Sequence, residues 1–145
     1  MGASERHLRT RVDRCPTASS SCTQKLNGAE IHDLFFDTGS SAFPLIVDFE
    51  RWRLITGRID GTEAPIQVTT NSWGTQITLD GAPMLGRIEF ASVRFEHPKV
   101  FYTKETPAGF RSLAFSVSGL LVNALFWDDI VVLDLSVSPQ FGILR

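Results

Sequence analysis

A carboxylate, two hydroxyls and a glycine stand together directly after an apolar run. Asp37 follows Leu34-Phe35-Phe36 and precedes Thr38-Gly39-Ser40. An apolar strand would fix the carboxylate at its end, and glycine would let the following turn pass close beneath it. A carboxylate held in this way can act as general acid or base on a water molecule. The same residues are also ordinary turn formers, so a plain hairpin turn remains a second interpretation.

The elements around this turn are expected to be strands. From Leu26 onward the chain consists of short apolar runs separated by turn residues, and residues 66–69 and 88–95 alternate apolar with polar side chains. Alternation with a period of two is typical of strands that are buried on one face. The sequence therefore predicts an all-β domain over residues 26–145, preceded by a flexible tail or docking arm over residues 1–25.

Turns and short helices complete this prediction. Glycine follows Asp60, Trp73 and Asp80, each time between two apolar runs, which predicts a chain reversal at each of these pairs. Residues 49–56 are expected to form a short helix because Phe49, Trp52 and Thr56 would share one face. Residues 123–129 are expected to form another, since Asn123 is a polar cap residue followed by Ala-Leu-Phe-Trp.

Three segments resemble aspartic peptidases of the pepsin-like and retropepsin-like families. Asp37-Thr38-Gly39 resembles their catalytic turn, and Trp73-Gly74-Thr75 resembles the tip of the flap that covers a bound peptide. Gly119-Leu120-Leu121-Val122 resembles the segment that runs beneath the catalytic turn and leads into a short helix. The segments occur in the order found in one lobe of that family. The resemblance implies a closed acid-protease-like barrel, a single lobe with one or two short helices.

Two residues depart from the family's pattern. Val122 stands where the family usually has glycine, and a β-branched side chain beneath the turn is expected to crowd it unless the loop shifts. Trp73 replaces the usual tyrosine of the flap but keeps a ring and an N–H donor. The departure at Val122 leaves open a catalytically silent peptide-binding or assembly module with the same fold.

The resemblance implies hydrolysis of peptide bonds by a water molecule that two carboxylates activate. No second Asp-Thr-Gly or Asp-Ser-Gly occurs in the chain, so one chain supplies half of such a site. We expect a homodimer in which the two Asp37 carboxylates meet, with Thr38 bonding across the axis and Ser40 bonding the carboxylate. A different partner lobe is the alternative, and an unrelated β-barrel or sandwich with Asp37 as a turn residue is another.

Composition excludes several other classes of function. Fourteen basic and sixteen acidic side chains give a net charge of −2, which argues against nucleic acid as a partner. No apolar run reaches the roughly 18 residues of a membrane span, and no secretory signal is seen, so a cytoplasmic protein is expected. Cys15 and Cys22 are interpreted as free thiols, with a local disulfide as the alternative. The three histidines are scattered, so no metal and no cofactor are expected.

Overall fold

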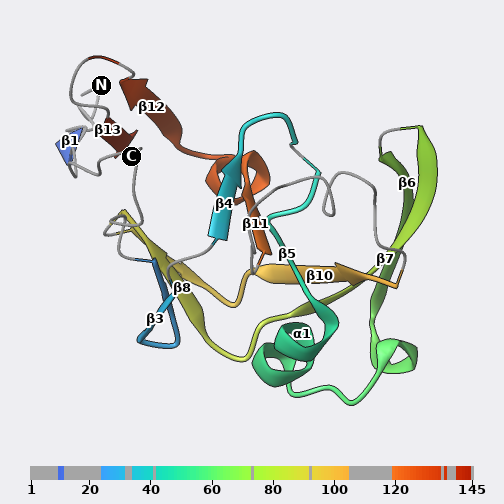
Figure 1. Cartoon of the computed structure of the whole chain (residues 1–145). Helices are drawn as coiled ribbons and strands as arrows, with labels where there is room; N and C mark the ends of the chain where they lie inside the picture. The colour runs from blue at the N-terminus through green and yellow to red at the C-terminus, as the bar shows by residue number, and fades with distance from the viewer. Residues whose placement is uncertain are drawn as a thin grey trace, which may run out of the picture.

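The computed structural model describes residues 10–11, 24–31, 34–40, 42–72, 74–91, 93–104, 119–134, 136 and 140–144. Strands dominate this part of the chain, which confirms the prediction of an all-β protein (Figure 1). The largest sheet has six strands in the spatial order β4 (Leu34–Asp37), β11 (Gly119–Val122), β5 (Leu45–Val47), β10 (Lys99–Thr103), β7 (Thr75–Pro83) and β6 (Ile66–Ser72).

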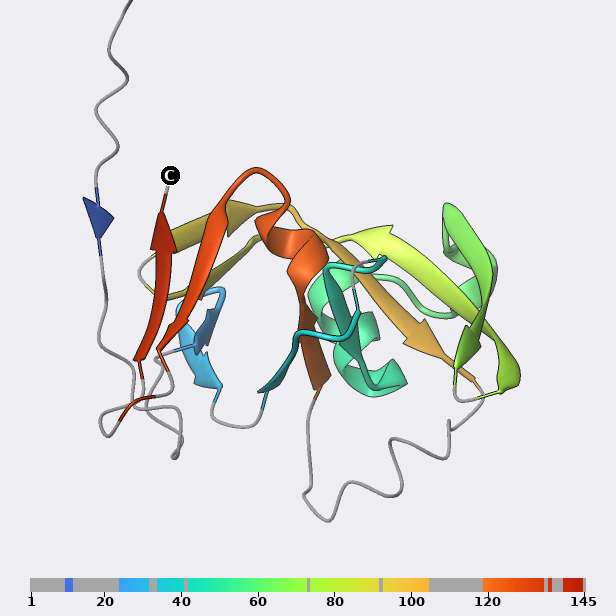
Figure 2. The ribbon, with the colours of Figure 1, turned by 90° about the horizontal axis from the view of Figure 1, so that it is seen from above.

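Two smaller sheets lie beside the large one (Figure 2). One has four strands in the order β3 (Ala29–Ile31), β2 (Gln24–Leu26), β8 (Arg87–Phe90) and β9 (Val93–Glu96). The other has three in the order β1 (Thr10–Arg11), β13 (Gln140–Leu144) and β12 (Ile130–Asp134). Strand β1 belongs to the segment expected to be a tail or docking arm, and it pairs with β13. The described strands form three open sheets, and the expected closed barrel is not found among them.

The strand order of the large sheet is out of sequence at one edge. Strand β11 lies between β4 and β5, parallel to β4 and antiparallel to β5. The chain that joins β4 to β5 is a loop over residues 38–44, so β11 enters from much later in the sequence to pair with both. This insertion brings residues 119–122 directly beside the strand that ends at Asp37.

The large sheet is apolar on both faces. Leu45, Val47, Val100 and Tyr102 belong to one buried cluster, which also contains residues of α1 and of the smaller sheets. Ile46 and Phe101, which alternate with them along the same strands, belong to a second cluster with Phe43, Ile77 and Leu79. Because neighbouring side chains of a strand point to opposite faces, the two clusters cover opposite sides of the sheet.

Helix α1 (Phe49–Thr56) has the bounds that the sequence predicted. It begins because Asp48 caps the first turn, its Oδ1 accepting the Arg51 N–H at 2.8 Å, and it ends at Gly57 in the left-handed conformation with a φ of 68°. Trp52 is fully buried and donates from Nε1 to the Val100 carbonyl oxygen at 3.1 Å. The helix is therefore fixed against β10.

A second short helix, η2 (Asn123–Phe126), is a 3₁₀ turn and is shorter than the predicted stretch over residues 123–129. Rings from four elements pack around it, with Phe36 of β4 at 5.1 Å from Phe141 and 5.7 Å from Phe126, centroid to centroid. Phe90 joins them at 4.8 Å from Phe141. This aromatic cluster anchors β4, and with it the turn at residue 37, to the two smaller sheets.

The predicted turn at Asp80-Gly81 is wrong, because both residues lie inside β7. Glycine is needed there for space: a Cβ at residue 81 would overlap the ring of Phe101, which lies across the glycine from the neighbouring strand. Close packing between strands, and not a chain reversal, therefore explains the pair. In the described parts of the chain, no helix has the length and apolar character needed to cross a membrane.

Candidate functional site

Asp37 is the last residue of β4, and its side chain is half-buried. Its Oδ1 accepts the backbone N–H of Gly39 at 2.8 Å. A Cβ at residue 39 would lie 3.2 Å from the same oxygen, so glycine is what allows the turn to come this close. Among the described residues this is the only hydrogen bond to the carboxylate, and none of them bonds to Oδ2.

The turn is held by a residue that the sequence did not single out for this role. Asn123 donates from Nδ2 to the backbone carbonyl oxygen of Thr38 at 2.8 Å. The sequence suggested Asn123 as a helix cap, but the residue at the cap position of η2 is Val122, which has no capping side chain. The expected bond from Ser40 to the carboxylate is not among the hydrogen bonds of the described residues. The only feature of the sequence that could have pointed to this role of Asn123 is that it is a polar residue directly after an apolar strand.

The segment beneath the turn contains Val122, in register with Asp37 across the parallel pair β4 and β11. Leu120 and Leu121 lie opposite Phe35 and Phe36 in the same way. Val122 is fully buried, and its φ of −123° and ψ of 156° are those of an extended strand. Any residue can adopt this conformation, so the backbone itself does not require glycine at residue 122.

The position in this segment that does require glycine is residue 119. A Cβ there would come within 2.6 Å of the Ile46 carbonyl oxygen and 3.0 Å of Leu34 Cδ2. Gly119 thus allows β11 to fit between its two neighbouring strands. Val122 in turn is connected to the loop after the turn, because its N–H donates to the Pro44 carbonyl oxygen at 3.1 Å.

The hairpin β6–β7 contains the segment that resembles a flap. Its strands pair from Ile66 opposite Gly81 to Ser72 opposite Thr75. Gly74 has a φ of 81°, a conformation that favours glycine, and its N–H donates to Asn71 Oδ1 at 2.9 Å. Thr75 is exposed. Trp73 lies outside the described residues, so its role stays a prediction.

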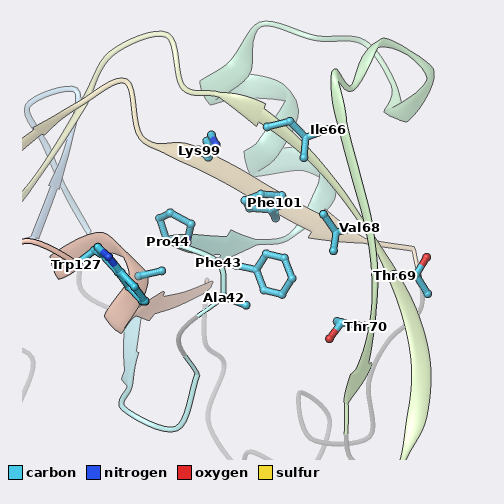
Figure 3. Close-up of a pocket in the computed structure, with 11 residues that line it drawn as sticks. Ala42, Phe43, Pro44, Ile66, Val68, Thr69, Thr70, Lys99, Phe101 and Trp127 are labelled. Atoms are coloured by element: carbon cyan, nitrogen blue, oxygen red, sulfur yellow. The ribbon is translucent and has the colours of Figure 1, made fainter.

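A cavity of about 540 Å³ separates the loop after the turn from the hairpin (Figure 3). The Phe43 and Phe101 rings form its apolar centre, 5.0 Å apart and edge to face. Asp37 is not among the lining residues, but the lining begins at Ala42 in the loop after the turn and includes Ala124, next to Asn123. The described residues that line the cavity are Ala42, Phe43, Pro44, Ile66, Val68, Thr69, Thr70, Lys99, Phe101, Ala124 and Trp127.

Asp60 and Asp80, the other two aspartates followed by glycine, are part of a separate network. Asp80 is buried and accepts from Gln67 Nε2 at 2.9 Å and from the Tyr102 hydroxyl at 3.2 Å. Lys104 Nζ lies 3.8 Å from its Oδ2. Burial, and then the nearby Asp80 charge, raise the pKa of Tyr102 to about 12.

Asp60 is exposed and caps the 3₁₀ turn η1 (Gly61–Glu63), accepting the Thr62 N–H at 2.8 Å. Hydrogen bonds from the Thr62 side chain and backbone lower the pKa of this carboxyl. A second cavity of about 450 Å³ lies beside Asp60 and Tyr102. Gly61 fits against Tyr102 and Asp80, since a Cβ there would overlap the Tyr102 hydroxyl oxygen.

No cluster of three or more His, Cys, Asp or Glu residues that could bind a metal ion occurs in the part of the chain that the structure describes. Comparisons of the chain with protein-family models, with curated proteins and with solved structures find no match. The functional proposal therefore depends on the geometry around Asp37.

Proposed function

We propose that the protein is an aspartic endopeptidase that acts as a homodimer, with Asp37 of each subunit as the catalytic residue. The observation that carries this proposal is the position of β11, which lies between β4 and β5 with Val122 in register with Asp37. This is the relation between catalytic turn and underlying segment that the resemblance implies. The Gly39 N–H on the Asp37 carboxylate and the short helix after Val122 agree with it.

The proposed chemistry needs two carboxylates about 3 Å apart that share one proton. The ionised Asp37 removes a proton from a water molecule as the water attacks the peptide carbonyl carbon. The protonated Asp37 of the second subunit donates its proton to the oxyanion that develops, which gives a gem-diol. The first Asp37 then passes the proton it took from water to the amine nitrogen as the C–N bond breaks. The second Asp37 takes back a proton from a gem-diol hydroxyl as the carbonyl reforms, so the pair again shares one proton. Because the two groups titrate as a pair, the rate of cleavage is expected to have a bell-shaped pH profile.

The substrate is an extended peptide that lies between the turn and the hairpin. Strand β6 is an outer strand of the large sheet, so its outward main-chain groups can bond to a peptide backbone. The cavity beside Phe43 and Phe101 accepts a side chain of that peptide. A cytoplasmic setting belongs to the same proposal, as does Thr38 bonding across the dimer axis.

Cleavage of a mixed peptide library from pH 3 to pH 8 tests the proposal. The wild type is compared with Asp37→Asn, and Asp48→Asn serves as the matched control, since asparagine also caps a helix well. We expect cleavage in the wild type and the control and its loss, by at least about a thousandfold, in Asp37→Asn. Dilution below the dimer dissociation constant should abolish cleavage as well. Activity that persists in Asp37→Asn contradicts the proposal.

A catalytically silent peptide-binding module is the second candidate, and the buried Val122 beside Asp37 is the observation that favours it. The same library distinguishes the two. Binding of peptides without cleavage by wild-type protein, at concentrations that favour dimers, supports the silent module. Activity that appears only after mixing with another protein would instead indicate a different partner lobe.

A further inference from the structure

Among the described residues that line the cavity next to the candidate site, Lys99 is the only charged one. We infer that this cavity binds a peptide with a large apolar side chain and an acidic residue two positions away. The apolar side chain lies on the Phe43 and Phe101 rings, and the carboxylate pairs with Lys99. The inference rests on the proposed function in one respect, the choice of a peptide as the ligand.

The apolar part of the cavity is formed by residues from three elements. Phe43 precedes β5, Phe101 lies in β10, and Ile66 and Val68 of β6 close the opposite side (Figure 3). Trp127 is 77% exposed and also lines the cavity, so a bound side chain could cover an aromatic ring that now faces water. Removing such a ring from water is favourable, and this explains why the cavity would select a bulky apolar group.

Lys99 supplies the charge. Its side chain is exposed, and none of the ion pairs between described residues involves it. Lys104, which directly follows β10, differs because its Nζ lies 3.8 Å from Asp80 Oδ2. An ammonium group beside an otherwise uncharged cavity attracts a carboxylate and repels a cationic ligand.

The spacing within the ligand follows from the strand. Lys99 and Phe101 lie on the same face of β10, two residues and therefore about 7 Å apart. An extended peptide repeats its side chains on one face at the same interval. A peptide that lies over the face of the sheet, in the direction of β10, can thus present an acidic residue to Lys99 while a residue two positions before or after it lies on Phe101.

Peptide binding to Asp37→Asn protein, which cannot cleave the ligand, tests the inference. The probes are short fluorescein-labelled peptides that contain Phe with Glu, Gln or Lys two positions away, and the measurement is fluorescence anisotropy at low ionic strength. We expect the Glu peptide to bind about fivefold more tightly than the Lys peptide, as is typical of a partly exposed ion pair. In the additional Lys99→Glu background the order of the two peptides should reverse.

Lys104→Glu is the matched control, because it makes the same charge change outside this cavity, and it should leave the order unchanged. Equal affinity for all peptides, no binding of any peptide, or the same order in Lys99→Glu would overturn the inference. Cleavage by wild type without charge preference would leave the proposed function intact and refute the inference. Charge-selective binding without any cleavage by wild type would support the inference and contradict the proposed function.

Discussion

Asp37 and Asp80 are both strand aspartates near a glycine, and they differ in the number of groups that bond to their carboxylates. Asp80 is buried and has a Gln67 amide, the Tyr102 hydroxyl and the Lys104 ammonium around it. Asp37 is half-buried and accepts one backbone N–H from a described residue. A buried carboxylate with its bonds satisfied holds a structure together. A carboxylate with an oxygen to which no described residue bonds is the better candidate for exchanging a proton with a ligand.

The largest effect expected from this comparison is on stability at Asp80. Asp80→Ala should lower the free energy of unfolding by about 3 kcal/mol, because it leaves the Tyr102 hydroxyl and the Gln67 amide without their acceptor. Asp37→Ala should lower it by less than about 1 kcal/mol while abolishing cleavage. Urea denaturation followed by circular dichroism measures both. Equal destabilisation of the two variants would remove the distinction between the carboxylates.

The next largest effect on stability is expected at Val122, the residue opposite Asp37. Val122→Gly should lower the free energy of unfolding by about 2–3 kcal/mol, because a fully buried side chain is lost and a flexible residue enters a strand. The cleavage rate per folded molecule should stay the same, since the backbone at residue 122 is already extended. A several-fold gain in activity would instead mean that the valine side chain crowds the turn.

A smaller effect is expected where the turn is held from η2. Asn123→Asp removes the amide donor to the Thr38 carbonyl oxygen with almost no change in shape. Cleavage should fall about tenfold, because the carboxylate loses its fixed position, while the free energy of unfolding falls by only about 1 kcal/mol. Asn71→Asp, on the hairpin, is the matched control, since Asn71 acts there as an acceptor. Unchanged kinetics in Asn123→Asp would show that the turn does not depend on this bond.

The smallest effect concerns the Asp80 network at high pH. The pKa of Tyr102 is about 12 in the folded protein, against 10.0 for the unperturbed group, so the unfolded state loses this proton first as the pH rises. Its contribution to stability is complete below pH 10 and is lost between about pH 10 and pH 12. Tyr102 is the only tyrosine, so tyrosinate absorbance follows it alone. Tyr102→Phe should remove this part of the pH dependence of stability. A titration midpoint of tyrosinate absorbance near pH 10 in the folded protein would contradict the prediction.

Local signals in the sequence predicted much of the fold. Helix α1 has its predicted bounds because Asp48 and Gly57 mark its ends within a few residues of one another. The prediction of a turn at Gly81 was wrong, because its small size makes room for the ring of Phe101 on a neighbouring strand. The turn at Asp37 could be predicted from the sequence for the same reason as the helix, since all of its features lie within a few residues.

Contacts between distant parts of the chain explain what the sequence could not predict. The bond from Asn123 to Thr38 joins residues 85 positions apart. The tight position at Gly119 depends on Ile46 and Leu34, which come from two other strands. The arrangement of three open sheets likewise follows from pairings that no local pattern specifies.

The insertion of β11 between β4 and β5 has a consequence for how the protein is made. During synthesis β4 and β5 leave the ribosome long before residues 119–122, so their main-chain hydrogen bonds to β11 cannot form until those residues have emerged. Such long-range pairing is slow, and open strand edges invite association with other chains. Nascent chains that stop before residue 119 should therefore aggregate, and the turn at Asp37 should gain its support from β11 only after residues 119–122 have left the ribosome.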